Sequence, residues 1–353
     1  MDRKIGTRIA EQRKKIGITQ NRLAEKLMVS NKTISRWESN LGNPSFEFIP
    51  KLCEILDCSA DYLFLGVETF EKYKKIKTGI YVDIGTNQRC EMHSEDLTMF
   101  PHLLAIGETG TGKSTLFHSF IVDILNYYKK EEVQLALIDC KRVEFGIYKE
   151  MPNLYMPLAQ TIESALEMLE KLVIEINDRC QKFLELKIKN IRQYNNISKE
   201  RMPYIVVFID ELAELKFNKR VMDLVVHLLR ISRAMGVHLI IGTQRLKSDT
   251  LTWEIREFCP TKICFKVNIK EQSEEFFSFA GGEELKGHGE MLFYKEKYKR
   301  LLKLQGKNYT GTSINSFLKE KGLPYREISD PDPEFIAFIE KALKDPKYIN
   351  LLI

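Results

Sequence analysis

The sequence predicts an α/β protein whose main domain has a mainly parallel sheet, preceded by a small all-α unit. Three observations predict this. Short β-rich runs alternate with long amphipathic segments from about residue 80 to 305, a pattern typical of a parallel sheet covered by helices. A glycine-rich loop ends the apolar run that starts at residue 102. Residues 1–66 instead carry closely spaced short segments with helical periodicity.

Composition narrows the class of protein. The chain has 353 residues, of which 44% are hydrophobic and 29% charged, so two or three soluble domains are expected. No apolar run approaches the roughly 18–20 residues of a membrane span, and the N-terminus lacks a signal-peptide core, so we predict a cytoplasmic protein. The seven scattered cysteines predict neither disulfides nor a zinc site, and a net charge of +5 permits nucleic-acid binding without requiring it.

Four segments are predicted along the chain. Residues 1–66 form the helical domain, and 67–79 form a linker that contains the basic run EKYKKIK. Residues 80–310 form the α/β domain, and 311–353 form a short helical tail.

The N-terminal unit is predicted to be a compact set of short helices. A first helix, IGTRIAEQRKKIG, is expected to end near Gly17. Thr19 and Ser30 are the predicted N-caps of the next two helices, TQNRLAEKL and NKTISRWES, which are separated by a tight turn. Two more helices fit FEFIPKLCEIL and SADYLFLG. The expected core residues are Leu23, Ile34 and Trp37.

The run HLLAIGETGTGKST matches G-x-x-x-x-G-K-[ST], the P-loop that holds phosphates. Its predicted nucleotide-binding residues are Gly107, Glu108, Thr109, Gly110, Thr111, Gly112, Lys113, Ser114 and Thr115. Glycines let backbone N–H groups converge on phosphate oxygens, and the next helix directs its positive end at the same anion. Lys113 is expected to reach the β- and γ-phosphates of ATP, and Ser114 to hold Mg²⁺. The alternative is a glycine-rich turn without a ligand.

An acidic pair supplies the second half of a hydrolytic site. The apolar run YIVVFI at 204–209 predicts a buried strand, and Asp210 and Glu211 follow at its carboxyl end, where parallel sheets bind ligands. Asp210 is expected to support the metal through Ser114 or water. Glu211 is expected to polarise the attacking water. This pair predicts a hydrolase and not merely a nucleotide-binding protein.

A third strand, VHLIIGTQR at 237–245, ends in polar residues. Gln244 is expected to sense the γ-phosphate from this neighbouring strand. The alternative is an amide that caps the strand.

The segment ITQNRLAEKLMVSNKTISRWESNLGNPSFEFIPKLCEILDCSADYLFLG resembles, without a gap, the Xre-type (phage-repressor) helix-turn-helix family. The resemblance implies that Asn31, Lys32 and Arg36 face DNA bases, with Thr33 on the same DNA-binding helix, and that Gln20 contacts phosphate. The alternative is a helix-turn-helix used only for protein contacts.

The motifs PHLLAIGETGTGKS, LALIDCKRVEFGIY, VVFIDELAEL, RAMGVHLIIGTQR, PTKICFKV and GGEELKGHGEMLFY resemble the FtsK/SpoIIIE family of DNA-pumping ATPases in order and spacing, over roughly residues 80–305. The resemblance implies a RecA-like motor that assembles as a ring, usually a hexamer, around duplex DNA. It further implies an arginine donated by a neighbouring subunit, for which Arg233 and Arg179 are candidates; a helix ion pair is the alternative for each. The sequence departs from the family pattern at Leu246 and Lys262, where proline and arginine are usual.

Together these features predict an ATP-dependent DNA translocase that binds DNA through its helix-turn-helix and pumps it by ATP hydrolysis. The combination resembles coupling proteins of plasmids and conjugative elements, which would imply a relaxase or a membrane channel as partner. The alternative is a nucleotide-gated transcriptional regulator that binds an operator. Slow ATP turnover that DNA barely stimulates would favour the regulator.

Overall fold

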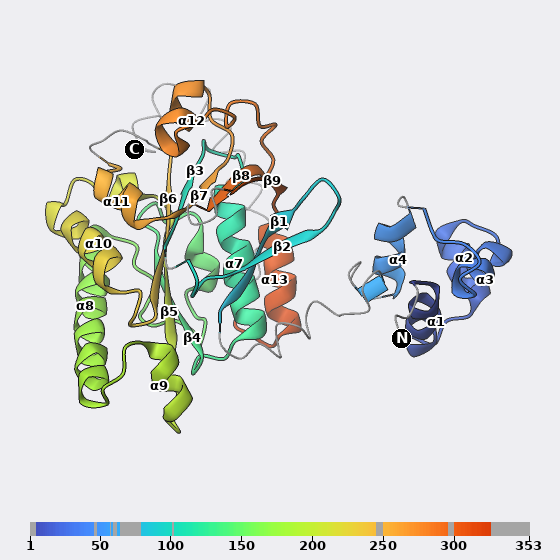
Figure 1. Cartoon of the computed structure of the whole chain (residues 1–353), viewed down its shortest axis with the longest axis horizontal. Coiled ribbons are helices and arrows are strands. Elements are labelled where there is room, and N and C mark those ends of the chain that lie inside the picture. Colours follow the sequence, from blue (N-terminus) through green and yellow to red (C-terminus); the bar gives the residue numbers. More distant parts are fainter. Residues whose placement is uncertain are drawn as a thin grey trace, which may run out of the picture. The chain divides into compact units, whose positions relative to one another are not determined.

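Figure 1 presents a computed structural model of the chain, which forms two compact units, Met1–Thr78 and Gly79–Ile353. Each unit is described by itself. The structure describes residues 5–45, 48–56, 58, 62–63, 79–100, 102–244, 250–295 and 300–325. Within these ranges no helix has the length and apolar character that crossing a membrane requires.

The first unit contains α1 (Ile5–Lys15), α2 (Gln20–Leu27), α3 (Asn31–Glu38) and α4 (Ile49–Leu56). Both predicted N-caps are confirmed, because Thr19 accepts a hydrogen bond from the Arg22 N–H and Ser30 accepts one from the Thr33 N–H. The predicted core is also confirmed, since these three side chains are buried: Leu23, Ile34 and Trp37.

Among the described residues of the second unit, nine strands form one sheet in the order β2-β1-β9-β8-β7-β3-β6-β5-β4. The bounds are β1 (Tyr81–Thr86), β2 (Met92–Asp96), β3 (His102–Ile106), β4 (Val133–Ile138), β5 (Tyr204–Ile209), β6 (Val237–Thr243), β7 (Thr261–Cys264), β8 (Glu290–Lys295) and β9 (Arg300–Gln305). The strands β7, β3, β6, β5 and β4 are parallel, and each corresponds to a predicted apolar run. The predicted α/β class is therefore confirmed.

The sheet is mixed because β8, β9, β1 and β2 extend it by antiparallel pairing. The sequence analysis did not predict these strands. The strand β1 alternates between buried and half-buried positions and β2 is mostly half-buried, so neither carries the continuous apolar run of a strand covered on both faces.

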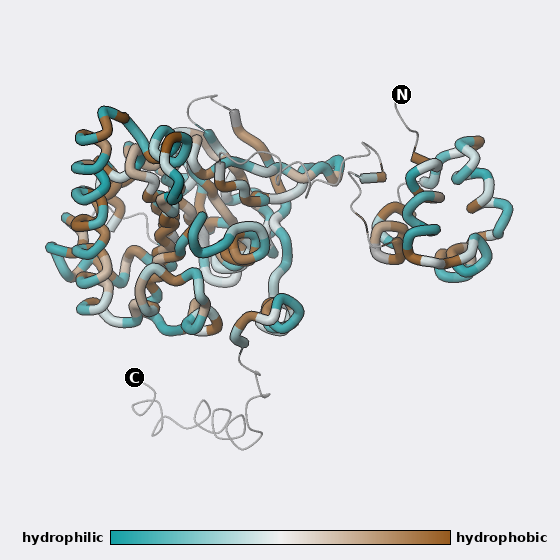
Figure 2. The backbone as a smooth tube through the Cα atoms, turned by 90° about the horizontal axis from the view of Figure 1, so that it is seen from below, coloured by the Kyte–Doolittle hydropathy of each residue, from teal (hydrophilic) through white to brown (hydrophobic). Residues whose placement is uncertain are grey.

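Helices cover both faces of the sheet (Figure 1). One face packs against α8, α10, α11 and α12, and the other against α7, η2 and α13. Figure 2 shows hydrophobic residues concentrated in the middle of this unit and hydrophilic residues on the outer helices. The bounds are α7 (Lys113–Tyr127), η2 (Phe145–Tyr148), α8 (Ile162–Glu185), η3 (Leu212–Glu214), α10 (Lys219–Ile231), α11 (Trp253–Phe258), α12 (Lys270–Phe277) and α13 (Gly311–Glu320).

The long helical segment predicted at 162–191 is divided in two. The helix α8 ends at Glu185, Lys187 adopts a left-handed conformation with φ 53°, and α9 (Ile191–Ile197) begins after Asn190. The Asn190 side chain accepts a hydrogen bond from the Gln193 N–H and so caps the second helix.

Some predictions fall outside the described residues. These are the basic run EKYKKIK, most of the helix SADYLFLG, the residues that follow Gln244, and the tail beyond residue 325. The predicted tail at 311–353 is described only as far as residue 325. This part contains α13, which buries Ile314 and Leu318 in the core of the second unit. The predicted domain boundaries stay predictions.

Candidate nucleotide-binding site

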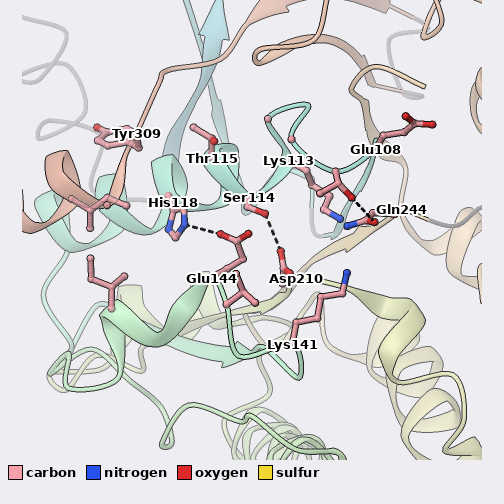
Figure 3. A pocket seen from close by; sticks show the side chains of 17 residues that line it. Glu108, Lys113, Ser114, Thr115, His118, Lys141, Glu144, Asp210, Gln244 and Tyr309 are labelled. Atoms are coloured by element: carbon pink, nitrogen blue, oxygen red, sulfur yellow. Dashed lines mark hydrogen bonds and ion pairs between the residues drawn. The ribbon is translucent and has the colours of Figure 1, made fainter. Parts of the chain in front are cut away.

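Apart from the two candidate arginines, the predicted site residues of the second unit meet at one edge of the sheet. The strands β3, β4, β5 and β6 are parallel, so their carboxyl ends all lie at this edge. The P-loop, the acidic pair, Gln244 and the loop after β4 follow these strand ends. Residues of the P-loop, Asp210, Gln244 and the loop after β4 line a cavity of about 610 Å³ (Figure 3).

The P-loop has the backbone that its glycines predict. Gly110 and Gly112 have φ values of 75° and 121°, which L-residues rarely adopt. A Cβ atom on Gly112 would lie 2.6 Å from the Gly289 Cα, so a side chain does not fit there. The Thr111 carbonyl accepts a 2.8 Å hydrogen bond from the Gly289 N–H, which fixes the loop against the segment before β8. The helix α7 then begins at Lys113 and directs its N–H groups into the cavity.

Lys113 is a buried cation that lacks a hydrogen-bond partner among the described residues. Its side chain is 5% exposed, and its Nζ lies 3.5 Å from the Glu211 Oε2. A buried ammonium group is costly without hydrogen bonds to an anion. Phosphate oxygens would supply those bonds, so this residue fits a nucleoside triphosphate.

Ser114 and Asp210 bring a hydroxyl and a carboxylate together, with 3.4 Å between Oγ and Oδ1. Burial raises the pKa of Asp210 to about 6, Lys113 opposes the rise, and Glu144 adds to it. A divalent cation would supply positive charge to this carboxylate, and hydroxyl and carboxylate oxygens are ligands that Mg²⁺ accepts. The pair therefore fits Mg²⁺.

Glu211 is held by partners from three segments. Its carboxylate accepts hydrogen bonds from the Thr243 hydroxyl at 2.9 Å and from the Gln244 N–H at 3.2 Å. Lys141 donates a further hydrogen bond at 3.3 Å. Burial raises the pKa of Glu211, but Lys113, Lys141 and the two hydrogen bonds from β6 and Gln244 together hold that pKa below its ordinary value. The carboxylate is therefore an anion whose position is fixed by β6 and two lysines.

Gln244 reaches the P-loop itself. Its Oε1 accepts a 3.1 Å hydrogen bond from the Thr109 hydroxyl, while its backbone N–H bonds Glu211 (Figure 3). The side chain thus lies beside the P-loop in the lining of the cavity. Its role toward the γ-phosphate stays a prediction.

The sequence analysis missed several residues that line this cavity. Lys141, Glu144, His118 and Tyr309 all do so. Asp139 shapes the loop that carries two of them, because its carboxylate accepts the Glu144 N–H at 2.9 Å. His118 lies one turn along α7 from Ser114, with its Nε2 3.3 Å from the Glu144 Oε2. A usable signal existed for the loop, because the polar run DCKRVE follows a predicted strand at the same edge.

Neither candidate arginine lies in this cavity. Arg179 is 1% exposed, pairs with Glu175 on the same helix at 2.8 Å and donates to the Met235 carbonyl at 2.8 Å. This geometry matches the helix ion-pair alternative. Arg233 is exposed in the turn before β6, at the sheet edge opposite the P-loop, and lines a separate cavity of about 280 Å³. Action of either arginine in a neighbouring subunit stays a prediction.

In the first unit, α3 exposes Asn31, Lys32 and Arg36. Thr33 is half-buried, with its Oγ1 2.8 Å from the Ser30 Oγ. Gln20 is directed inward, because its Nε2 donates to a Glu38 carboxylate oxygen at 2.8 Å. The predicted phosphate contact of this amide thus competes with an internal hydrogen bond, which the sequence alone does not reveal.

Parallel strands carry a P-loop after β3 and an acidic pair after β5, with β6 between these two strands. This arrangement defines the second unit as a P-loop nucleotide-binding domain. The sequence model of the FtsK/SpoIIIE family matches residues 68–248, and a helix-turn-helix model matches residues 9–63. The chain belongs to the FtsK/SpoIIIE family.

Relatives agree with this membership. DNA translocase FtsK of Clostridium tetani is 33% identical over 260 residues, covering 71% of this chain and 35% of the relative. DNA translocase SpoIIIE of Bacillus subtilis is 34% identical over 239 residues, covering 64% of this chain and 30% of the relative. The chain thus spans about a third of the length of these relatives.

Solved structures resemble the chain as well. The monomer form of the pCW3 conjugation coupling protein TcpA with ATPγS aligns with a TM-score of 0.62 and 26% identity, covering 78% of this chain and 85% of that one. The cytoplasmic domain of the Thermomonospora curvata type VII secretion ATPase EccC has the same TM-score at 20% identity, covering 72% of this chain and 33% of that one, and is similar in fold alone.

Proposed function

We propose that this chain is an ATP-dependent DNA translocase with its own DNA-docking unit. ATP hydrolysis at the sheet edge would drive duplex DNA past the second unit, and the helix-turn-helix would bind a chosen site. The observation that carries the proposal is the combination of two sites in one chain of this family. The second unit contains a P-loop with an acidic pair near it, and the first unit exposes Asn31, Lys32 and Arg36 on one helix.

Each residue of the nucleotide site would have a defined task. Lys113 would bind the β- and γ-phosphate oxygens, and Ser114 and Asp210 would hold Mg²⁺. When bound, the cation would neutralise charge that develops on the phosphate oxygens. Glu211 would orient and polarise the attacking water. Gln244, which contacts both Glu211 and the P-loop, would report the γ-phosphate to β6.

Assembly into a ring, with six subunits around the DNA, is part of the same proposal. In such a ring the P-loop edge of one subunit would face a neighbour. Arg233 is exposed at the opposite edge of the sheet, outside its own nucleotide cavity, so it is free to serve the site of a neighbouring subunit. Its guanidinium would then stabilise charge on the transferred phosphoryl group.

The cargo would be the DNA of a plasmid or another mobile element during transfer or partition. The likeness to a conjugation coupling protein, which extends over most of both chains, supports this choice. A relaxase or a membrane channel would be the partner that receives this DNA.

ATP turnover combined with strand displacement tests the proposal. Duplex DNA is expected to raise the ATPase rate at least tenfold, and the chain is expected to displace the third strand of a triplex while it hydrolyses ATP. Both activities are expected to vanish in Lys113→Ala. If triplexes stay intact and specific operator binding instead varies with ATP, the chain is a nucleotide-gated regulator and the translocase proposal is wrong.

Replacing Arg36 with alanine is expected to weaken site-specific DNA binding roughly 5- to 100-fold, because one arginine–base contact contributes about 1–3 kcal/mol. The ATPase rate stimulated by nonspecific duplex is expected to change less than twofold. Fluorescence anisotropy with a selected site and a scrambled duplex measures the first effect. Lys15→Ala is the matched control, since it removes one exposed charge from α1 without altering α3. Equal losses on both duplexes would mean that Arg36 contacts only the backbone.

A further inference from the structure

The nucleotide cavity extends past the P-loop to a wall formed by one aromatic and two aliphatic side chains. Tyr309 lines it from the segment that leads into α13, Ile314 from α13 itself, and Ile147 from η2. Ile314 is 1% exposed and Tyr309 is half-buried against the core. A total volume of about 610 Å³ suits a ligand larger than a triphosphate chain, since small-molecule sites span ~300–1,000 Å³.

The P-loop fixes which end of a nucleotide faces this wall. Lys113 and Gln244 lie together at one end of the cavity (Figure 3). The Lys113 Nζ lies 3.5 Å from the Glu211 carboxylate, so this end is where the γ-phosphate is expected. The loop backbone cradles the α- and β-phosphates, and Thr115 follows the motif in the first turn of α7. Figure 3 shows Tyr309 beside Thr115, away from Lys113 and Gln244. A nucleotide bound by this loop therefore directs its nucleoside toward Tyr309.

The residues just before Tyr309 are held by contacts to three other segments of the second unit. The Gly306 N–H donates to the Gly289 carbonyl at 2.9 Å, and Gly289 in turn bonds the P-loop. The Lys307 Nζ contacts Asp83 at 2.7 Å and Asp123 at 3.3 Å, which ties the segment to β1 and α7. The ring of Tyr309 is therefore positioned by the same elements that position the phosphates.

We propose that Tyr309, with Ile314 and Ile147, forms the binding site for the base of the nucleoside triphosphate. The inference rests on the proposed nucleotide-binding function and adds the part of the site that the P-loop does not supply. A planar aromatic base has two apolar faces, and the tyrosine ring offers a stacking surface while the isoleucines exclude water. No motif of the sequence pointed to this wall.

Two ligands separate the base site from the phosphate site: ATP, and tripolyphosphate, which carries the same phosphates without a nucleoside. Calorimetric titration of the full chain with each ligand, in the presence of Mg²⁺, gives both dissociation constants. In Tyr309→Ala the affinity for ATP is expected to fall roughly 10-fold, while the affinity for tripolyphosphate changes less than twofold. In Lys113→Ala the affinities for both ligands are expected to fall.

Two further variants serve as controls. Tyr309→Phe keeps the ring and is expected to bind ATP within twofold of the unsubstituted chain. Tyr325→Ala removes an exposed tyrosine just beyond α13 and is expected to change neither affinity. Equal losses of ATP and tripolyphosphate in Tyr309→Ala, or no loss of either, would overturn the inference. Because no DNA is present, selective loss of ATP would support the base site even if duplex DNA failed to stimulate hydrolysis, a result that would defeat the translocase proposal alone.

Discussion

Replacing Glu211 with glutamine is expected to leave ATP bound but to slow its hydrolysis about 10²- to 10⁴-fold, the usual contribution of a general base. Glutamine has the same size, and its amide oxygen can still accept the Thr243 and Gln244 hydrogen bonds that hold the side chain. The substitution removes the negative charge that would polarise water. Single-turnover hydrolysis measures the rate, and calorimetric titration measures the ATP dissociation constant, which we expect to change less than fivefold.

Glu214→Gln is the matched control for that experiment. It makes the same change three residues further along the chain, at an exposed position of η3, and is expected to leave the hydrolysis rate within twofold. The competing role for Glu211 is structural, because Lys141 and Thr243 join it to two neighbouring strands. Loss of ATP binding together with a lowered melting temperature in Glu211→Gln would favour that structural role.

The parallel part of the fold could be predicted from the sequence because strands buried on both faces require continuous apolar runs. YIVVFI and VHLIIGT are such runs, and both lie where expected. The antiparallel extension could not be predicted in the same way. Its strand β2, MHSED, has only one buried residue, so its register depends on pairing with β1 and not on its own pattern.

The candidate site likewise has a part that could be predicted from the sequence and a part that could not. The phosphate end follows from spacing within short segments, because a P-loop and two acids after a strand are local patterns. Tyr309 belongs to no such local pattern, since its place in the cavity depends on how α13 packs against the rest of the second unit. Lys141 is an intermediate case. It follows a predicted strand, yet only the parallel register of β4 and β5 reveals that its ammonium reaches Glu211.

Replacing Lys113 with methionine is expected to weaken ATP binding at least 100-fold, about 2.7 kcal/mol, because the ammonium supplies charge-assisted hydrogen bonds to two phosphates. The fold is expected to tolerate the change. Methionine retains the length of the buried stem, and the Lys113 Nζ makes no hydrogen bond to a described residue, so no such bond within the protein is lost. Calorimetric titration measures the affinity, and thermal unfolding is expected to show a melting temperature within about 3 °C of the unsubstituted chain.

Lys141→Met separates the P-loop contact from the general charge of the cavity. Both lysines approach Glu211, at 3.5 Å for Lys113 and 3.3 Å for Lys141, so each variant removes one cation from the same carboxylate. Only Lys113 belongs to the P-loop. We therefore expect Lys141→Met to retain ATP affinity within about tenfold, because the phosphates keep their direct ligand. Equal losses in the two variants would mean that total positive charge, and not the position of Lys113, determines ATP binding.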